Sequence, residues 1–153
     1  MEQRINFFEK GQDAIKALHG INAYLTKSQI EKPLLNLIYF RVSQINGCAY
    51  CLDMHAKDLR AAGETEQRLY VLAAWHEAPF YTDRERAALA WAEAVTKISG
   101  ADVPDVVYHQ AKAQFSEEEL IELTLAVIAI NSYNRINVSF RTVAGSYQVG
   151  QFA

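Results

Sequence analysis

The sequence has little of what secreted, membrane-spanning or nucleic-acid-binding proteins depend on. It has two cysteines and three prolines in 153 residues, and no apolar run reaches the roughly 18 residues that a membrane-spanning helix needs. There is no run of lysine or arginine, and the formal net charge is −3, which argues against a surface for nucleic acid or an anionic membrane. The first residues lack the apolar core of a signal peptide. We therefore expect a cytoplasmic protein with no nucleic-acid or membrane partner.

Half of the residues are apolar, so a chain of this length can bury a core in one domain, residues 1–153. The β-branched residues do not alternate between marked turns, so no segment is typical of a strand. The sequence also has no low-complexity segment and no clear internal repeat. We expect a single all-α domain.

Apolar periodicity and capping residues predict seven helices, at about 8–25, 33–46, 48–63, 65–78, 82–95, 105–113 and 117–143. Gly20 weakens the first of them. Two capping boxes, Thr82 with Glu85 and Ser116 with Glu119, open the fifth and the last helix.

The last helix is apolar on more than one face, which predicts a central position in the fold or burial by a partner subunit. Four polar residues interrupt it: Asn131, Asn134, Arg135 and Asn137. They could line the space near the thiols or form a subunit contact. We favour buried or interfacial side chains whose hydrogen bonds are satisfied, because buried polar groups usually find partners.

The two cysteines form a C-x-x-C motif that is followed by a histidine: Cys48, Cys51 and His55. Each helical residue advances by about 100°, so these three side chains share one narrow face of a helix. Asn46 is a good N-cap and Gly47 allows a tight entry, which predicts that the helix starts here. Cys48 would then lie in the first turn, where free N–H groups and the helix dipole stabilise a thiolate.

This arrangement is typical of thiol redox chemistry in a reducing compartment. A thiolate attacks a hydroperoxide or a disulfide, and the second thiol then closes an internal disulfide. His55 could carry the proton from a thiol to the leaving group. Cys48 is nearer the helix start, whereas His55 is one turn from Cys51, so the residues leave open which sulfur attacks.

Two alternatives remain for the motif. Cys48, Cys51 and His55 are acceptable zinc ligands, and His19, His76 or His109 could supply a fourth, although none repeats the spacing of a half-site. The cysteines could also be inert core residues beside a hydrogen-bonded histidine. We expect neither a metal ion nor a bound cofactor.

The sequence resembles the alkylhydroperoxidase D-like core of the carboxymuconolactone decarboxylase superfamily. The resemblance covers residues 33–98, with the final helix matching loosely, and it is carried by residues 41–55, R-V-S-Q-I-N-G-C-A-Y-C-L-D-M-H, and 87–93, A-A-L-A-W-A-E. It implies an all-α fold, a trimeric or hexameric homo-oligomer and peroxidase activity through the two cysteines. It also implies a peroxiredoxin partner, with a lipoyl protein as the source of electrons. Members of the decarboxylase branch generally lack the cysteine pair.

One departure from the family concerns its proton relay. The family usually has a glutamate about twelve residues before the first cysteine, where this chain has Asn36. An amide cannot take up a proton near neutral pH. Glu31, Asp53 and Asp58 are candidate replacements that the sequence does not rank.

We therefore predict a thiol-dependent peroxidase or disulfide oxidoreductase that reduces hydroperoxides, with Cys48, Cys51 and His55 as its catalytic residues. One alternative is a redox-sensing or interaction module without turnover. Another is a decarboxylase-type enzyme of the wider superfamily that uses His55 without thiol chemistry.

Overall fold

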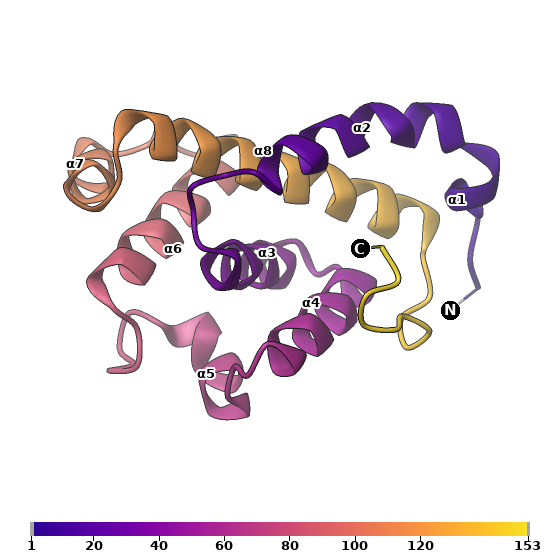
Figure 1. Ribbon diagram of the computed structural model, residues 1–153, viewed down its shortest axis with the longest axis horizontal. Helices are drawn as coiled ribbons and strands as arrows, with labels where there is room; N and C mark the ends of the chain where they lie inside the picture. Colours follow the sequence, from indigo (N-terminus) through magenta and orange to yellow (C-terminus); the bar gives the residue numbers. More distant parts are fainter. Residues whose placement is uncertain (1, 153) are drawn as a thin grey trace.

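The computed structural model describes residues 2–152 and folds them into α-helices with no strand in that range (Figure 1). The elements are α1 (Phe7–Lys10), α2 (Gln12–Leu25), α3 (Lys32–Asn46), α4 (Ala49–Ala61), α5 (Glu66–Val71), the 3-10 helix η1 (Leu72–Ala74), α6 (Asp83–Thr96), α7 (Asp105–Gln114) and α8 (Glu117–Phe140). The all-α prediction is confirmed. Within residues 2–152, no helix combines the length and the apolarity that crossing a membrane would demand.

The first predicted helix is in fact two helices, and the break lies at Gly11 rather than at Gly20. A Cβ atom at Gly11 would lie 3.1 Å from the carbonyl oxygen of Phe7, closer than almost any side chain tolerates. Glycine therefore lets the chain turn between α1 and α2. A Cβ atom at Gly20 would meet nothing within 4 Å, so α2 passes through this position without a break.

Local capping residues start the later helices as predicted. Both capping boxes form, with Thr82 and Glu85 at α6 and with Ser116 and Glu119 at α8. The end of α8 differs from the prediction, because the chain leaves the helix at Arg141, which has a left-handed φ of 56°. The helix is therefore three residues shorter than the sequence indicated.

Helices α3 and α8 form the centre of the molecule, with α2 along one side of α8 and with α4 and α6 against α3 (Figure 1). Most of their buried side chains belong to one hydrophobic core, which includes Leu37, Ile38, Leu123 and Val127. Tyr50 and Cys51 of α4 pack in a small separate cluster. The shared core confirms the central position that the sequence predicted for the last helix. Helix α8 is not buried on every face: Ile121, for example, is 70% exposed.

A partly buried amide network joins the end of α3 to α8. The side-chain nitrogen of Asn46 donates to the side-chain oxygens of Asn131 (3.0 Å) and Asn134 (2.9 Å). The Asn134 nitrogen in turn donates to Ser43 Oγ at 3.0 Å, and Arg135 donates to Asn131. The prediction of satisfied polar groups is therefore confirmed for this part of α8. The network fixes the point from which the chain enters the cysteine helix.

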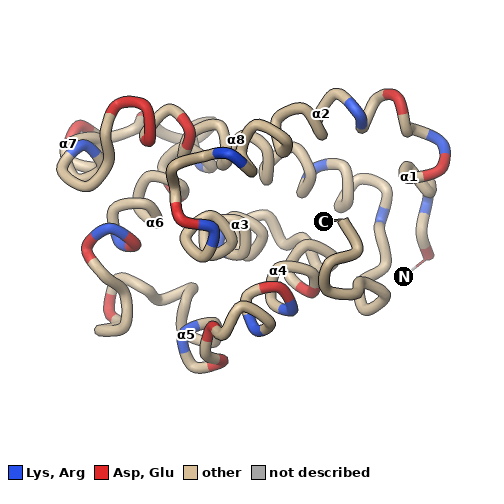
Figure 2. The backbone as a smooth tube through the Cα atoms, in the orientation of Figure 1, with Lys and Arg blue, Asp and Glu red and all other residues tan. Residues whose placement is uncertain are grey.

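Residues 141–152 form a C-terminal strap that turns back across α4 (Figure 1). Asp53 accepts a hydrogen bond from the Gly145 N–H at 3.0 Å, and Lys57 donates to the carbonyl oxygens of Gly145 and Tyr147. The Tyr147 hydroxyl donates to Asp58 at 2.8 Å. Figure 2 shows that α4 carries both acidic and basic residues, and these contacts use charges of both signs to hold the strap.

Candidate active site

The cysteine motif begins where α3 gives way to α4. Gly47 ends α3 with a left-handed φ of 65°, a conformation that costs glycine little. Cys48 is itself the N-cap of α4, and its Sγ accepts the Cys51 N–H at 3.3 Å. The prediction that Asn46 caps this helix is therefore wrong: Asn46 is the last residue of α3, and its amide is used by the network to α8. The position of the pair at a helix start is confirmed.

The two sulfurs are joined in a disulfide, with a Cα–Cα distance of 5.3 Å. Both cysteines are buried, each with 1% of its surface exposed. Across residues 2–152, no three His, Cys, Asp or Glu side chains gather closely enough to hold a metal ion. The three histidines considered as a fourth zinc ligand lie on other elements: His19 on α2, His76 after η1 and His109 on α7.

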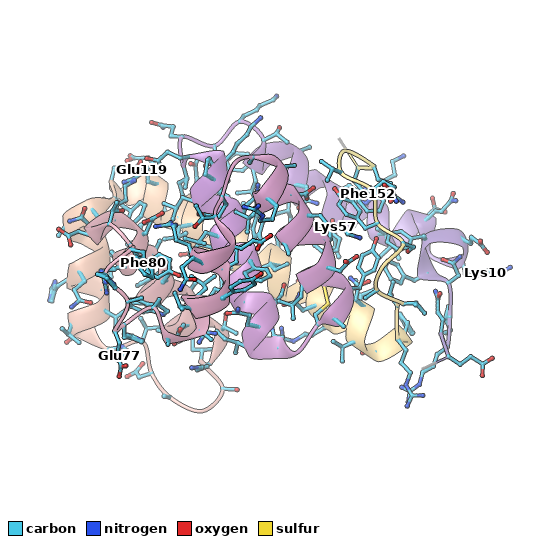
Figure 3. The ribbon with its side chains drawn as sticks, turned by 90° about the horizontal axis from the view of Figure 1, so that it is seen from below. Lys10, Lys57, Glu77, Phe80, Glu119 and Phe152 are labelled. Carbon is cyan, nitrogen blue, oxygen red and sulfur yellow. A yellow bond between two sulfur atoms is a disulfide. The ribbon has the colours of Figure 1, made fainter. Side chains whose placement is uncertain are left out.

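A cavity of about 840 Å³ lies beside the disulfide, between α2, α3, α4 and α8, with α1 and the strap as its remaining walls. Cys51 and His55 line this cavity, whereas Cys48 is not part of its lining. The structure therefore separates the two cysteines: one sulfur belongs to the side chain that faces the cavity, and the other caps the helix behind it. Figure 3 shows Lys57 of α4 and Phe152 of the strap near each other in that view, with Lys10 further toward the edge of the molecule.

Seven phenylalanine and tyrosine side chains contribute to the wall of the cavity: Phe7, Phe8, Tyr39, Tyr50, Tyr133, Tyr147 and Phe152. Five of them form one cluster of contacting rings, with centroids 4.2 Å apart for Phe7 and Phe8, 5.7 Å for Phe8 and Phe152, 5.8 Å for Tyr147 and Phe152, and 6.4 Å for Phe8 and Tyr50. This aromatic cluster draws on α1, α4 and the strap, so segments far apart in the sequence form one wall of the cavity.

His55 is 7% exposed, and neither of its ring nitrogens has a hydrogen-bond partner within the protein. Its ring centroid lies 5.4 Å from that of Tyr39. Burial lowers the pKa of the His55 imidazole to about 4, because the charged form is poorly solvated there. The imidazole is therefore neutral near pH 7, with one nitrogen able to accept a proton and the other able to donate one.

The structure distinguishes between the three acids that could replace the family's glutamate in the proton relay. Asn36, at the position of the family's glutamate, lines the cavity, and so does Asp58. Glu31 is exposed and binds an arginine of α6, and Asp53 binds the lysine one turn further along α4. Asp58 is therefore the only one of the three candidates that faces the cavity, and it accepts a hydrogen bond from the Tyr147 hydroxyl.

Two further residues belong to the site: Tyr39, which the sequence did not indicate, and Asn137, for which a lining near the thiols was the less favoured alternative. Tyr39 of α3 lines the cavity beside His55, and nothing in the helical periodicity distinguishes it from a core aromatic. Asn137 of α8 was predicted to have its hydrogen bonds satisfied, but its side-chain oxygen is buried without a partner and the residue lines the cavity. Its signal in the sequence was a polar residue within an otherwise apolar helix.

The chain is similar to known proteins over most of its length. The carboxymuconolactone decarboxylase family profile matches residues 10–94. The uncharacterized protein YdfG of Bacillus subtilis (strain 168) is 42% identical over 146 residues, which are 95% of this chain and 99% of YdfG.

Solved structures agree with this assignment. ATU0492 from Agrobacterium tumefaciens, a protein of unknown function for which a role in antioxidant defence as AhpD has been suggested, superposes with a TM-score of 0.91 at 41% identity. The match covers 95% of this chain and 100% of ATU0492. A peroxidase-related protein from Silicibacter sp. TM1040 shares the fold, with a TM-score of 0.77 at 23% identity over 92% of this chain and 75% of its own. The chain is therefore an AhpD-like member of the carboxymuconolactone decarboxylase family.

Proposed function

We propose that this protein is a thiol-dependent peroxidase that reduces organic hydroperoxides through the Cys48–Cys51 couple. The observation that carries the proposal is a disulfide at a helix start with one of its cysteines, Cys51, facing a cavity beside the unpaired imidazole of His55. Membership of the AhpD-like family supports a peroxidase-related role at the level of the family.

Cys51 is the sulfur that attacks in this proposal, because it lines the cavity that would admit the hydroperoxide. His55 lies one helical turn further along α4, on the same face. Cys48 resolves the intermediate. Its Sγ accepts the Cys51 N–H, an interaction that also stabilises a Cys48 thiolate when a reductant attacks the sulfur of Cys51.

The chemistry balances with the groups present and an external dithiol. The Cys51 sulfur attacks the terminal oxygen of the hydroperoxide, the O–O bond breaks, and the alkoxide leaves. His55 takes the thiol proton and returns it to the alkoxide, which departs as an alcohol. The Cys48 sulfur then attacks the sulfenic acid on Cys51, the disulfide forms and water leaves. A dithiol reduces the disulfide and is itself oxidised to a disulfide.

The test is hydroperoxide consumption by the purified protein with dihydrolipoamide as reductant. We expect many equivalents of cumene hydroperoxide to be consumed for each chain. Intact-mass measurement should show that the reduced protein loses two hydrogens within one chain on oxidation. Oxidation that stops after one equivalent, although the reductant restores both thiols, would contradict turnover and favour the alternative of a redox sensor.

Replacing Asn36 by glutamate should raise kcat/KM for hydroperoxide, by about tenfold, because the new carboxyl would face the cavity and could share the proton with His55. The rate is measured under the same conditions as for the wild-type protein. Glu31→Gln is the matched control, since it changes an exposed carboxylate on the same segment and should leave the rate unaltered. An unchanged rate in Asn36→Glu would place this position outside the proton relay.

The other expectations from the sequence belong to this proposal. A peroxiredoxin or a lipoyl-bearing electron donor stays a prediction, as do a trimeric or hexameric assembly and a cytoplasmic location. Exposed apolar side chains of α8, including Ile121 and Ile128, are available for contact between copies of the chain.

A further inference from the structure

We infer that Asn137 of α8 binds the substrate by accepting a hydrogen bond, and that the substrate is an aromatic hydroperoxide that carries an additional O–H donor. This inference rests on the proposed peroxidase function, since it assigns a substrate class to the same cavity. It is carried by one buried acceptor that has no partner and by the aromatic wall around it.

The orientation of the Asn137 amide is fixed by the helix. The side-chain nitrogen donates to the backbone carbonyl oxygen of Tyr133, one turn earlier, at 2.9 Å. A carbonyl oxygen can only accept, so the nitrogen must face Tyr133 and the amide oxygen must point elsewhere. That oxygen is an acceptor only, and a ligand must bring a donor to satisfy it.

Burial makes this acceptor selective. Asn137 is 5% exposed, and its oxygen has no partner within the protein. A buried polar atom that stays unpaired is costly, so a ligand with a donor should bind better than an otherwise identical ligand without one. The Thr142 hydroxyl is also buried and unpaired, but Thr142 does not line the cavity.

Two other pairs of polar side chains in the wall are already hydrogen-bonded to each other. Asn22 donates to the Tyr133 hydroxyl at 3.0 Å, and the Tyr147 hydroxyl donates to Asp58 at 2.8 Å. His55 is required for the proton of the reacting sulfur. Among the described residues of the wall, only His55 and Asn137 have buried side-chain polar atoms without a partner, so Asn137 is the one available to hold a part of the substrate that does not react.

The rest of the cavity wall favours a substrate that is flat and apolar apart from its O–H and peroxide groups. The aromatic cluster and a volume of about 840 Å³ suit a substrate with one or two rings, within the range of roughly 300–1,000 Å³ that ligand sites occupy. Cys51 and His55 lie on α4, whereas Asn137 lies on α8. A substrate held between these helices would present its peroxide group to α4 and its O–H group to α8.

The kinetic test compares two aryl hydroperoxides, one with a phenol hydroxyl on its ring and one with that hydroxyl replaced by a methyl ether. We expect the wild-type protein to favour the phenol by about tenfold in kcat/KM, and Asn137→Leu to lose this preference while it still consumes the ether. Ser132→Ala, a change at a half-buried serine of α8 outside the cavity lining, is the control that should retain the preference. Equal rates for both substrates in the wild-type protein would overturn the inference, whether or not the variant folds.

A binding test separates this inference from the proposed reaction. Titration of the oxidised protein with 2-naphthol and with 2-methoxynaphthalene needs no turnover. We expect a Kd about tenfold lower for 2-naphthol in the wild-type protein, and similar Kd values for the two ligands in Asn137→Leu. A naphthol preference without hydroperoxide consumption would refute the peroxidase alone. Equal binding of the two ligands by the wild-type protein, or no binding of either, would refute the role of Asn137.

Discussion

Replacing Cys51 by serine should reduce hydroperoxide turnover by at least about 1,000-fold, because it removes the sulfur that attacks the O–O bond. Replacing Cys48 should have a different result. Cys51 still faces the cavity in that variant, so one hydroperoxide is reduced and the sulfenic acid on Cys51 then has no partner sulfur. The two variants would thus distinguish the attacking cysteine from the resolving one, a question that the sequence left open.

Intact mass after hydroperoxide treatment provides the measurement. Cys48→Ser should gain one oxygen per chain, which dimedone traps, and Cys51→Ser should gain none. The wild-type protein should instead lose two hydrogens. A sulfenic acid that appears in Cys51→Ser and not in Cys48→Ser would reverse the roles assigned here.

Lowering the pH from 7 to 4 should cost the oxidised protein about 3 kcal/mol of unfolding free energy through His55 alone. Burial lowers the pKa of this imidazole from 6.5 to about 4. Between these values the unfolded chain binds a proton at this residue and the folded protein does not. Stability is therefore full above about pH 6.5, falls as the pH drops below it, and levels off below about pH 4.

Denaturant unfolding at pH 7 and pH 4 measures this loss in the wild-type protein and in His55→Leu. The variant lacks the titrating group, so its stability should fall by about 3 kcal/mol less over the same range. His109→Leu, which changes an exposed histidine of α7, should follow the wild-type protein. If His55→Leu instead followed the wild-type pH dependence, the imidazole would have to be solvated in the folded state.

The sequence predicted those features that depend on neighbouring residues. A capping box joins residues three apart, so the box formed by Thr82 and Glu85 could be predicted without knowing the fold. The spacing of Cys51 and His55 likewise predicts that both lie on one face of a helix, and both line the cavity.

Features that depend on contacts between residues far apart in the sequence could not be predicted in this way. The prediction that Asn46 caps the cysteine helix was wrong, because its amide binds asparagines of α8, some 85 residues further along the chain. The choice among the candidate acids depended on tertiary ion pairs, which leave only Asp58 facing the cavity. The strap was unpredictable for the same reason, since Lys57 holds it through backbone carbonyl oxygens that have no signature in the sequence.

The strap has a consequence for how members of this family diverge. Residues 7–8 and 147–152 furnish much of the aromatic wall, whereas the redox motif lies within the segment 33–98. Evolution can therefore alter which molecules enter by exchanging a few peripheral side chains, without touching the sulfurs or the imidazole. We expect relatives that share the motif but differ in the segments equivalent to residues 7–8 and 147–152 to carry out the same reaction on different compounds.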